Sequence, residues 1–276
     1  MTSRRSAAAV DAARAEGRAA LVGYLPVGFP DVAGSVEAVR AMVAGGVDVV
    51  ELGLPYSDPL MDGPVIQGAV DTALRGGTRT RDVLAAVEQA AATGAPVLVM
   101  TYWNPIDRYG VDRFAADLAG AGGAGLITPD LVPDEGADWV AASEAHALDR
   151  VFLVAPSSTD ARLRSTVSAC RGWVYAASTM GVTGIRAQVS DGAQELVART
   201  RAAGAERVCV GLGVSSGDQA ATVAGYADGV IVGTAFARAL HDGVGAVRAL
   251  AEELADGVRR GRPALESAAP AGGPTA

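Results

Sequence analysis

Lysine is absent from this chain of 276 residues, so all 23 of its Lys or Arg positions are arginines. An aldolase that forms a Schiff base needs a lysine amine, and so does an enzyme that anchors pyridoxal phosphate covalently. The sequence therefore excludes both of these enzyme classes.

Positive charge is scarce as well. The 23 basic side chains stand against 31 acidic ones, which gives a formal net charge of −8. A broad nucleic-acid surface needs clustered positive charge, so we expect no nucleic-acid partner. Aromatic residues make up only 5% of the chain, whereas half of it is hydrophobic. This length and composition fit one large α/β domain or two small ones.

Cysteine and long apolar runs are also rare. Cys170 and Cys209 have no C-x-x-C spacing, so we expect two buried thiols and no disulfide framework. No apolar run reaches the roughly 18 residues of a membrane span. The first residues contain two arginines but no apolar segment typical of a secretory signal. We therefore expect a cytoplasmic protein with no membrane partner.

Short apolar runs rich in β-branched residues recur along the chain, and their length is typical of strands buried on both faces. Stretches with helical spacing lie between them; in one, Ser35 is the predicted N-cap and Gly45 the predicted stop. This alternation predicts a (β/α)8 TIM barrel, preceded by an extra N-terminal helix from Ser6 to Glu16. The strand candidates are residues 20–25, 47–53, 95–100, 124–130, 149–155, 172–178, 206–213 and 228–235.

A doubly wound open sheet is the alternative fold. The barrel is favoured because the chain offers eight units with no break in composition. We expect residues 1–260 to form one catalytic domain. Residues 261–276 are small and rich in proline, which predicts a disordered tail.

An acid interrupts the second strand candidate near its end. Successive side chains of a strand point to opposite faces, so Glu51 shares one face with Val49, while Val50 and Leu52 share the other. If Val50 and Leu52 pack on the outer helices, Glu51 points into the barrel at the end where such folds carry their active sites. The structural alternative is a buried ion pair, but no strand end offers an arginine within reach. Apolar neighbours would raise the pKa of Glu51, as suits a group that gives and takes a proton. Asp62, eleven residues on, is by itself more typical of a turn.

Three glycines lie at or just beyond the C-terminal ends of the last three strand candidates, at the same end of the predicted barrel. Gly184, Gly213 and Gly233 would let backbone N–H groups approach an anion, and Thr234 would begin a helix. The loops after strands seven and eight hold phosphate in many barrels. Simple turn residues are the alternative, but three glycines in successive loops favour a phosphate site that needs no lysine.

Seven segments closely resemble the tryptophan synthase alpha chain family, in the family's order and along nearly the whole chain. They are ELGLPYSDPLMDGPVIQ (51–67), GYLPVGFPD (23–31), MTYWNPI (100–106), PDLVPDE (129–135), VYAASTMGVTG (174–184), GLGVSS (211–216) and VGTAF (232–236). The resemblance implies a lyase of tryptophan biosynthesis with the barrel fold. Its reaction is the reversible retro-aldol cleavage of indole-3-glycerol phosphate to indole and D-glyceraldehyde 3-phosphate, without a metal or a cofactor.

The resemblance also implies roles for individual residues. Glu51 would protonate indole C3 and help remove the hydroxyl proton, and Asp62 would accept the indole N–H. Tyr175 would lie near the reacting hydroxyl, although a core aromatic is an equal alternative. The loops after strands two and six would close over the substrate, with Thr183 bonding Asp62. Tyr24, Thr183, Leu212 and Val232 would line the indole pocket, and Gly184, Gly213, Gly233 and Thr234 would hold the phosphate.

Family members usually work in an α2β2 heterotetramer whose beta chain carries pyridoxal phosphate and receives the indole. One departure concerns this partner: Val132 stands where the family commonly has proline, in a segment near the partner surface. We expect it to affect partner affinity more than chemistry. Three alternatives stay open: a stand-alone lyase, a non-catalytic allosteric barrel, and another phosphate-binding barrel such as a sugar-phosphate isomerase. The Glu51 to Asp62 segment disfavours the last two.

Overall fold

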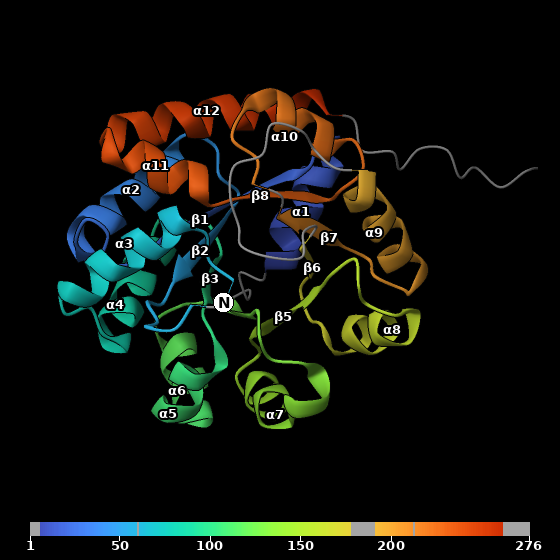
Figure 1. Cartoon of the computed structure of the whole chain (residues 1–276), viewed down its shortest axis with the longest axis horizontal. Coiled ribbons are helices and arrows are strands. Elements are labelled where there is room, and N and C mark those ends of the chain that lie inside the picture. Colours follow the sequence, from blue (N-terminus) through green and yellow to red (C-terminus); the bar gives the residue numbers. More distant parts are fainter. Residues whose placement is uncertain (1–5, 60, 178–190, 212, 262–276) are drawn as a thin grey trace, which may run out of the picture.

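The computed structural model describes residues 6–59, 61–177, 191–211 and 213–261 (Figure 1). Residues 262–276, which carry nearly all of the predicted disordered tail, lie outside this part of the chain.

Eight parallel strands form a closed barrel in chain order. The ring closes because β1 pairs with β8 as well as with β2. This closure confirms the predicted barrel and rules out the open sheet. The strands are β1 (Ala20–Pro26), β2 (Val49–Gly53), β3 (Val97–Met100), β4 (Gly125–Thr128), β5 (Asp149–Val154), β6 (Val174–Ala177), β7 (Val208–Gly211) and β8 (Gly229–Val232).

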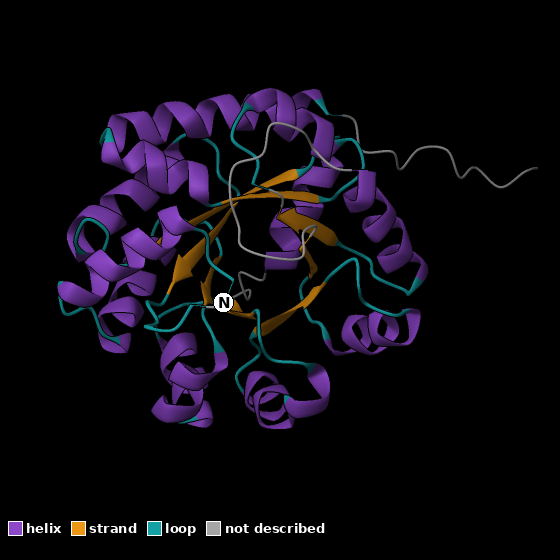
Figure 2. Ribbon diagram, in the orientation of Figure 1, coloured by secondary structure: helices purple, strands orange, loops and turns teal. Residues whose placement is uncertain are grey.

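Helices surround the strand ring on its outside (Figure 2). The predicted extra helix comes first among the described residues, and it ends one residue earlier than expected. The helices are α1 (Ser6–Ala15), α2 (Val32–Ala44), α3 (Pro64–Arg75), α4 (Thr80–Ala91), α5 (Trp103–Tyr109), α6 (Val111–Gly120), α7 (Ala137–Ala145), α8 (Asp160–Ala169), α9 (Asp191–Ala202), α10 (Gly217–Ala224), α11 (Thr234–His241) and α12 (Val244–Arg260), with a 3-10 turn at Pro133–Glu135.

The start of α2 differs from the prediction. Asp31, not Ser35, is the N-cap, and its carboxylate accepts a hydrogen bond from the Gly34 amide at 2.7 Å. Ser35 lies one turn inside the helix, where its hydroxyl donates to the Val32 carbonyl at 2.8 Å. An earlier capping acid therefore overrides the serine. The predicted stop at Gly45 is confirmed.

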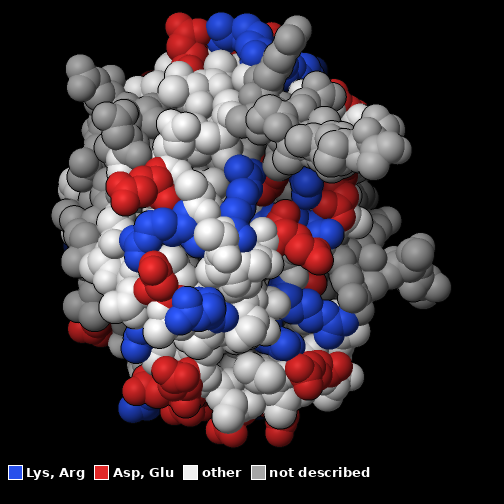
Figure 3. Space-filling view, turned by 90° about the vertical axis from the view of Figure 1, so that its right-hand side faces the viewer, with Lys and Arg blue, Asp and Glu red and all other residues white. Residues whose placement is uncertain are grey.

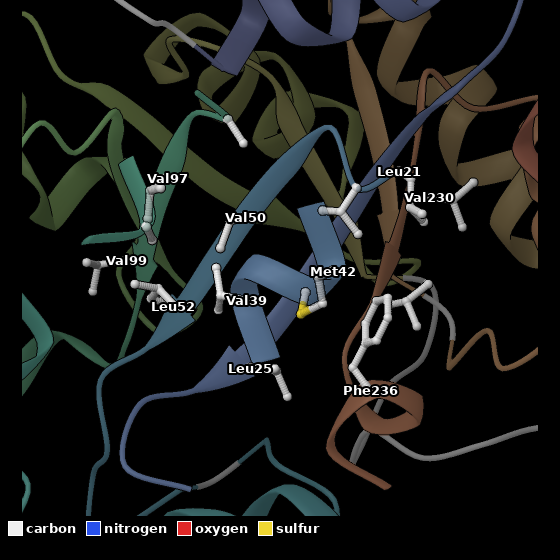
Figure 4. Packing of buried hydrophobic residues seen from close by; sticks show 14 of the residues in the cluster. Leu21, Leu25, Val39, Met42, Val50, Leu52, Val97, Val99, Val230 and Phe236 are labelled. Carbon is white, nitrogen blue, oxygen red and sulfur yellow. The ribbon is translucent and has the colours of Figure 1, made fainter. Parts of the chain in front are cut away.

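Two hydrophobic clusters separate the two faces of each strand. Val50 and Leu52 of β2 belong to the outer cluster and pack beside Val39 and Met42 of α2 (Figure 4). Val49 belongs to the inner cluster, inside the barrel. The alternation along β2 therefore runs as predicted, with residue 51 on the inner face.

Helix α1 closes the end of the barrel where the strands begin, and in Figure 1 it lies within the outline of the ring. Val10 and Ala13 of α1 join the inner cluster. The first residue of α1 is fixed by hydrogen bonds: the Ser6 amide donates to the Asp149 carboxylate at 2.9 Å, and Trp173 Nε1 donates to the Ser6 hydroxyl at 3.1 Å. The opposite end of the barrel stays available for a site.

Candidate active site

A cavity opens where the strands end, and it collects most of the predicted site residues. Residues from several strand ends and from the loop after β2 contribute to its wall. The predicted residues that line it are Tyr24, Glu51, Asp62, Tyr175, Gly213, Gly233 and Thr234.

Four other predicted residues are not placed in this cavity. Thr183, Gly184 and Leu212 lie outside the described residues. Val232 does not line the cavity but belongs to the outer cluster, so its predicted place in the indole pocket is wrong. Strand alternation directs its neighbour Ile231 inward, and Ile231 lines the cavity instead.

Glu51 is fully buried on the inner face of β2. In the strand register it lies beside Tyr24 of β1 and Leu98 of β3. Neither of its carboxyl oxygens has a hydrogen-bond partner among the described residues. Burial without a partner disfavours the charged form and raises the pKa of Glu51 to about 8. At neutral pH this side chain is therefore an acid that carries its proton.

This burial makes the stability of the free protein depend on pH. Folded Glu51 keeps its proton up to about pH 8, whereas the ordinary glutamate pKa, which applies in the unfolded chain, is 4.5. The folded state therefore binds more protons than the unfolded chain between these two values. The contribution of the Glu51 proton to the free energy of unfolding is full below pH 4.5, decreases as the pH rises from there, and is lost once the pH has risen through 8.

The variant Glu51→Gln removes this titration. We expect its free energy of unfolding to rise relative to wild type by at least ~1 kcal/mol between about pH 5 and pH 8.5, since one pKa unit corresponds to about 1.4 kcal/mol. Urea unfolding at both pH values measures the difference. Glu88→Gln, at an exposed position on α4, is the matched control for loss of a carboxylate. If the free energy of unfolding of Glu51→Gln relative to wild type were the same at both pH values, the burial argument would be contradicted.

Asp62 lies in the loop after β2, just before Gly63 caps α3. It is half-buried, and burial raises its pKa to about 6. At neutral pH the cavity therefore holds one protonated carboxyl, Glu51, and one carboxyl that is mostly ionised, Asp62. Two carboxyls whose environments separate their pKa values can divide acid and anion roles between them.

Two tyrosines flank these carboxyls. Burial raises the pKa of both Tyr24 and Tyr175, and the charges of Glu51 and Asp62 raise it further. Both phenols therefore stay protonated and can donate hydrogen bonds. Glycine makes room for each hydroxyl: a Cβ at Gly53 would collide with the Tyr24 hydroxyl.

A Cβ at Gly211 would likewise collide with the Tyr175 hydroxyl. Gly53 and Gly211 were not among the residues predicted for the site. Their position as the last residues of β2 and β7 was the available signal, but the phenols above them belong to other strands.

The part of the cavity formed by β7 and β8 suits an anion. Gly213 has a φ of +72°, which favours glycine. Gly233 precedes α11, which begins at Thr234 as predicted. The first N–H groups of a helix have no partner within it, so the start of α11 offers donors to the cavity. A second helix, α10, begins after β7. Its N-cap is Ser216, whose hydroxyl accepts a hydrogen bond from the backbone amide of Gln219.

Other kinds of site find little support. Within the described ranges, no group of His, Cys, Asp and Glu side chains could hold a metal ion. None of the described helices is long and apolar enough to cross a membrane. On the face shown in Figure 3, arginines are interspersed with acidic side chains, without the continuous basic surface that nucleic acid requires.

The chain is similar in sequence to proteins of one known family. A family model described as "Tryptophan synthase alpha chain" matches residues 10–262. The chain is 63% identical to a tryptophan synthase alpha chain of Mycobacterium intracellulare over 251 residues, which cover 91% of this chain and 93% of the relative. It is 62% identical to that of Thermobifida fusca over 256 residues, covering 90% of this chain and 95% of the relative.

Solved structures agree with these relatives. A structure of Mycobacterium tuberculosis tryptophan synthase superimposes with a TM-score of 0.90 at 61% identity, covering 92% of this chain and 98% of that one. A tryptophan synthase complex from Pyrococcus furiosus gives a TM-score of 0.79 at 29% identity, covering 86% of this chain and 98% of that one.

Proposed function

The chain belongs to the tryptophan synthase alpha chain family, and from this premise we propose that Glu51 and Asp62 carry its chemistry between them. The alpha chain is the lyase subunit that cleaves indole-3-glycerol phosphate in tryptophan biosynthesis, and the family works without a cofactor of its own. The observation that carries the proposal is the buried, unpartnered carboxyl of Glu51 in one cavity with Asp62.

The chemical problem is the leaving carbon, because an indole C3 carbanion is too unstable to expel. Glu51 holds its proton at neutral pH and gives it to indole C3, so the ring becomes an indolenine that can accept electrons. Glu51, now a carboxylate, takes the proton of the glycerol hydroxyl. The carbon–carbon bond then breaks, its electron pair returns to the ring, and glyceraldehyde 3-phosphate and indole are formed. Glu51 ends the cycle protonated, as it began.

Asp62 acts on the same intermediate from the ring nitrogen. Protonation of C3 places positive charge on that nitrogen, and an ionised carboxylate that accepts its N–H stabilises the charge. The lower pKa of Asp62, about 6 against about 8 for Glu51, supports this division of roles. Tyr24 and Ile231 offer apolar surface to the indole, and Tyr175 a donor near the reacting hydroxyl. Thr183 and Leu212 keep their roles as predictions from the family resemblance.

The phosphate of the substrate would occupy the anion end of the cavity. Gly213 and Gly233 allow close backbone approach, and the N-terminus of α11 at Thr234 supplies N–H donors and a favourable dipole. The predicted Gly184 contact lies outside the described residues. We propose that residues 1–260 act as one catalytic domain, since the ring draws its strands from residues 20–232.

The solved relatives include a tryptophan synthase complex. We infer that this chain also works with a beta chain, in an α2β2 assembly in the cytoplasm, and passes indole to it; pyridoxal phosphate would be bound by the beta chain. The position of Val132 supports an effect on partner binding rather than on catalysis. Val132 lies next to the 3-10 turn at Pro133–Glu135 and does not line the cavity.

Titration with a beta chain from a relative tests this assembly. We expect the two chains to co-purify. The rate of indole release should rise by about tenfold or more, a factor within the usual range of coupling between sites. The rise should saturate when the two chains are present in equal amounts. Val132→Pro, which restores the usual residue, should tighten the complex and leave the rate of the free chain unchanged. Absence of both co-purification and activation would favour the stand-alone lyase.

A further inference from the structure

The segment between β2 and Asp62 is fastened to the end of β3. The Leu54 amide donates to the Met100 carbonyl at 3.0 Å, and the Thr101 hydroxyl donates to the Leu54 carbonyl at 3.2 Å. The segment therefore leaves β2 in a fixed direction over the cavity.

The same stretch of chain holds the segment again, directly before Asp62. The Met61 amide donates to the Tyr102 hydroxyl at 2.9 Å, and Tyr102 is itself only 6% exposed. The Tyr102 ring lies 5.4 Å from that of Tyr56, whose hydroxyl accepts a hydrogen bond from Asn104 at 3.3 Å. These contacts fix the position of the Tyr102 hydroxyl and, through it, the backbone next to Asp62.

A second contact holds the other side. Gln67, in the first turn of α3, donates from Nε2 to the carbonyl oxygen of Asp62 at 2.7 Å. The backbone of Asp62 is thus held on its N-terminal side by Tyr102 and on its C-terminal side by Gln67. Neither contact uses the carboxylate, so the charged group stays available to a ligand.

Tyr102 has its own support from the next strand. The Trp103 amide donates to the Asp130 carboxylate, at 2.9 and 3.1 Å from its two oxygens. Asp130 follows the end of β4, so α5 starts at a fixed point immediately after Tyr102. The hydroxyl that holds the Met61 amide therefore belongs to the barrel rather than to a free loop.

We propose that Tyr102 and Gln67 are positioning residues for the cleavage reaction, which fix the backbone on both sides of Asp62 and so aim its carboxylate at the substrate nitrogen. The inference rests on the proposed role of Asp62. Among the described residues no hydrogen bond is found to the Asp62 carboxylate, and only the backbone carbonyl of Asp62 accepts one, so the direction of the carboxylate is set by its backbone and rotamer. Misplacement of a reacting group by about 1 Å can lower a rate by roughly 100-fold, so this support has kinetic consequences.

The test removes each contact separately. Tyr102→Phe deletes the hydroxyl, and Gln67→Met deletes the amide donor while keeping the length of the side chain. We expect each variant to lower kcat for indole-3-glycerol phosphate cleavage by about tenfold with KM within about twofold of wild type. Added to Asp62→Asn, either change should lower kcat by less than about twofold more, because the group that it positions is already gone.

Tyr226→Phe is the matched control. It also deletes a buried tyrosine hydroxyl, but the Tyr226 hydroxyl, unlike that of Tyr102, has no hydrogen-bond partner among the described residues. It should leave kcat and KM unchanged. If both Tyr102→Phe and Gln67→Met keep wild-type kcat while Asp62→Asn is severely impaired, the positioning role is wrong and the role of Asp62 stands. An equal loss with and without Asp62→Asn also overturns it, because the effect then bypasses Asp62. A fully active Asp62→Asn overturns both. If Tyr102→Phe does not fold, Gln67→Met decides alone.

Discussion

Glu51→Gln is expected to lower kcat for cleavage of indole-3-glycerol phosphate by about 10³-fold or more, while the Kd for substrate stays within about threefold of wild type. Glutamine keeps the shape of the side chain but has no proton to give to indole C3, and general acid–base groups contribute roughly 10²- to 10⁴-fold. Because Glu51 has no hydrogen-bond partner among the described residues, the substitution breaks no internal bond. Indole release in single turnovers and substrate titration by calorimetry measure the two quantities.

Glu88→Gln, on the exposed face of α4, removes a carboxylate outside the cavity and should leave both quantities unchanged. Retention of more than about a tenth of the wild-type kcat by Glu51→Gln would remove Glu51 from the mechanism. An inactive wild type that binds the substrate, alone and with a beta chain, would instead favour the non-catalytic barrel.

Asp62→Asn is expected to lower kcat by about 10²- to 10³-fold, comparable to the loss of one electrostatic stabiliser of a transition state. Asparagine can still accept the indole N–H, but it cannot balance the positive charge that develops on the ring nitrogen. The pH profile of kcat/KM gives a second signature. In the wild type, activity falls below about pH 6 as Asp62 is protonated, and above about pH 8 as Glu51 loses its proton. The variant should lose the acid limb and keep the alkaline one.

Asp58→Asn is the control within the same loop, because Asp58 is exposed and its carboxylate accepts a hydrogen bond from Ser57. Measured without a beta chain, it should retain wild-type activity. An acid limb that persists in Asp62→Asn would assign that titration to another group.

The sequence predicted those features that follow from strand alternation. The inward direction of Glu51 required only that Val50 and Leu52 face the helices, and the two hydrophobic clusters show this arrangement. The family resemblance placed Val232 in the indole pocket, but strand alternation turns Val232 outward, and Ile231 lines the cavity instead. The predicted cap at Ser35 failed because Asp31 lies one turn earlier and reaches the Gly34 amide.

Other parts of the site depend on contacts between segments far apart in the chain. The bond between the Met61 amide and the Tyr102 hydroxyl joins residues 41 positions apart. Gly53 is informative only once the Tyr24 hydroxyl is placed above it. The different pKa values of Glu51 and Asp62 arise from different degrees of burial, which neither composition nor spacing contains.

The separation of the two hydrophobic clusters has an evolutionary consequence. Along β2, Val50 and Leu52 pack against the helices, whereas the alternate residues Val49 and Glu51 face the interior of the barrel. Mutations at adjacent positions therefore meet different neighbours, so a substitution on the inner face leaves the side-chain contacts between the strand and the helices in place. A lineage could replace the residues that meet the substrate while keeping those that hold the barrel. Such a fold can acquire a new substrate without first having to rebuild its own support.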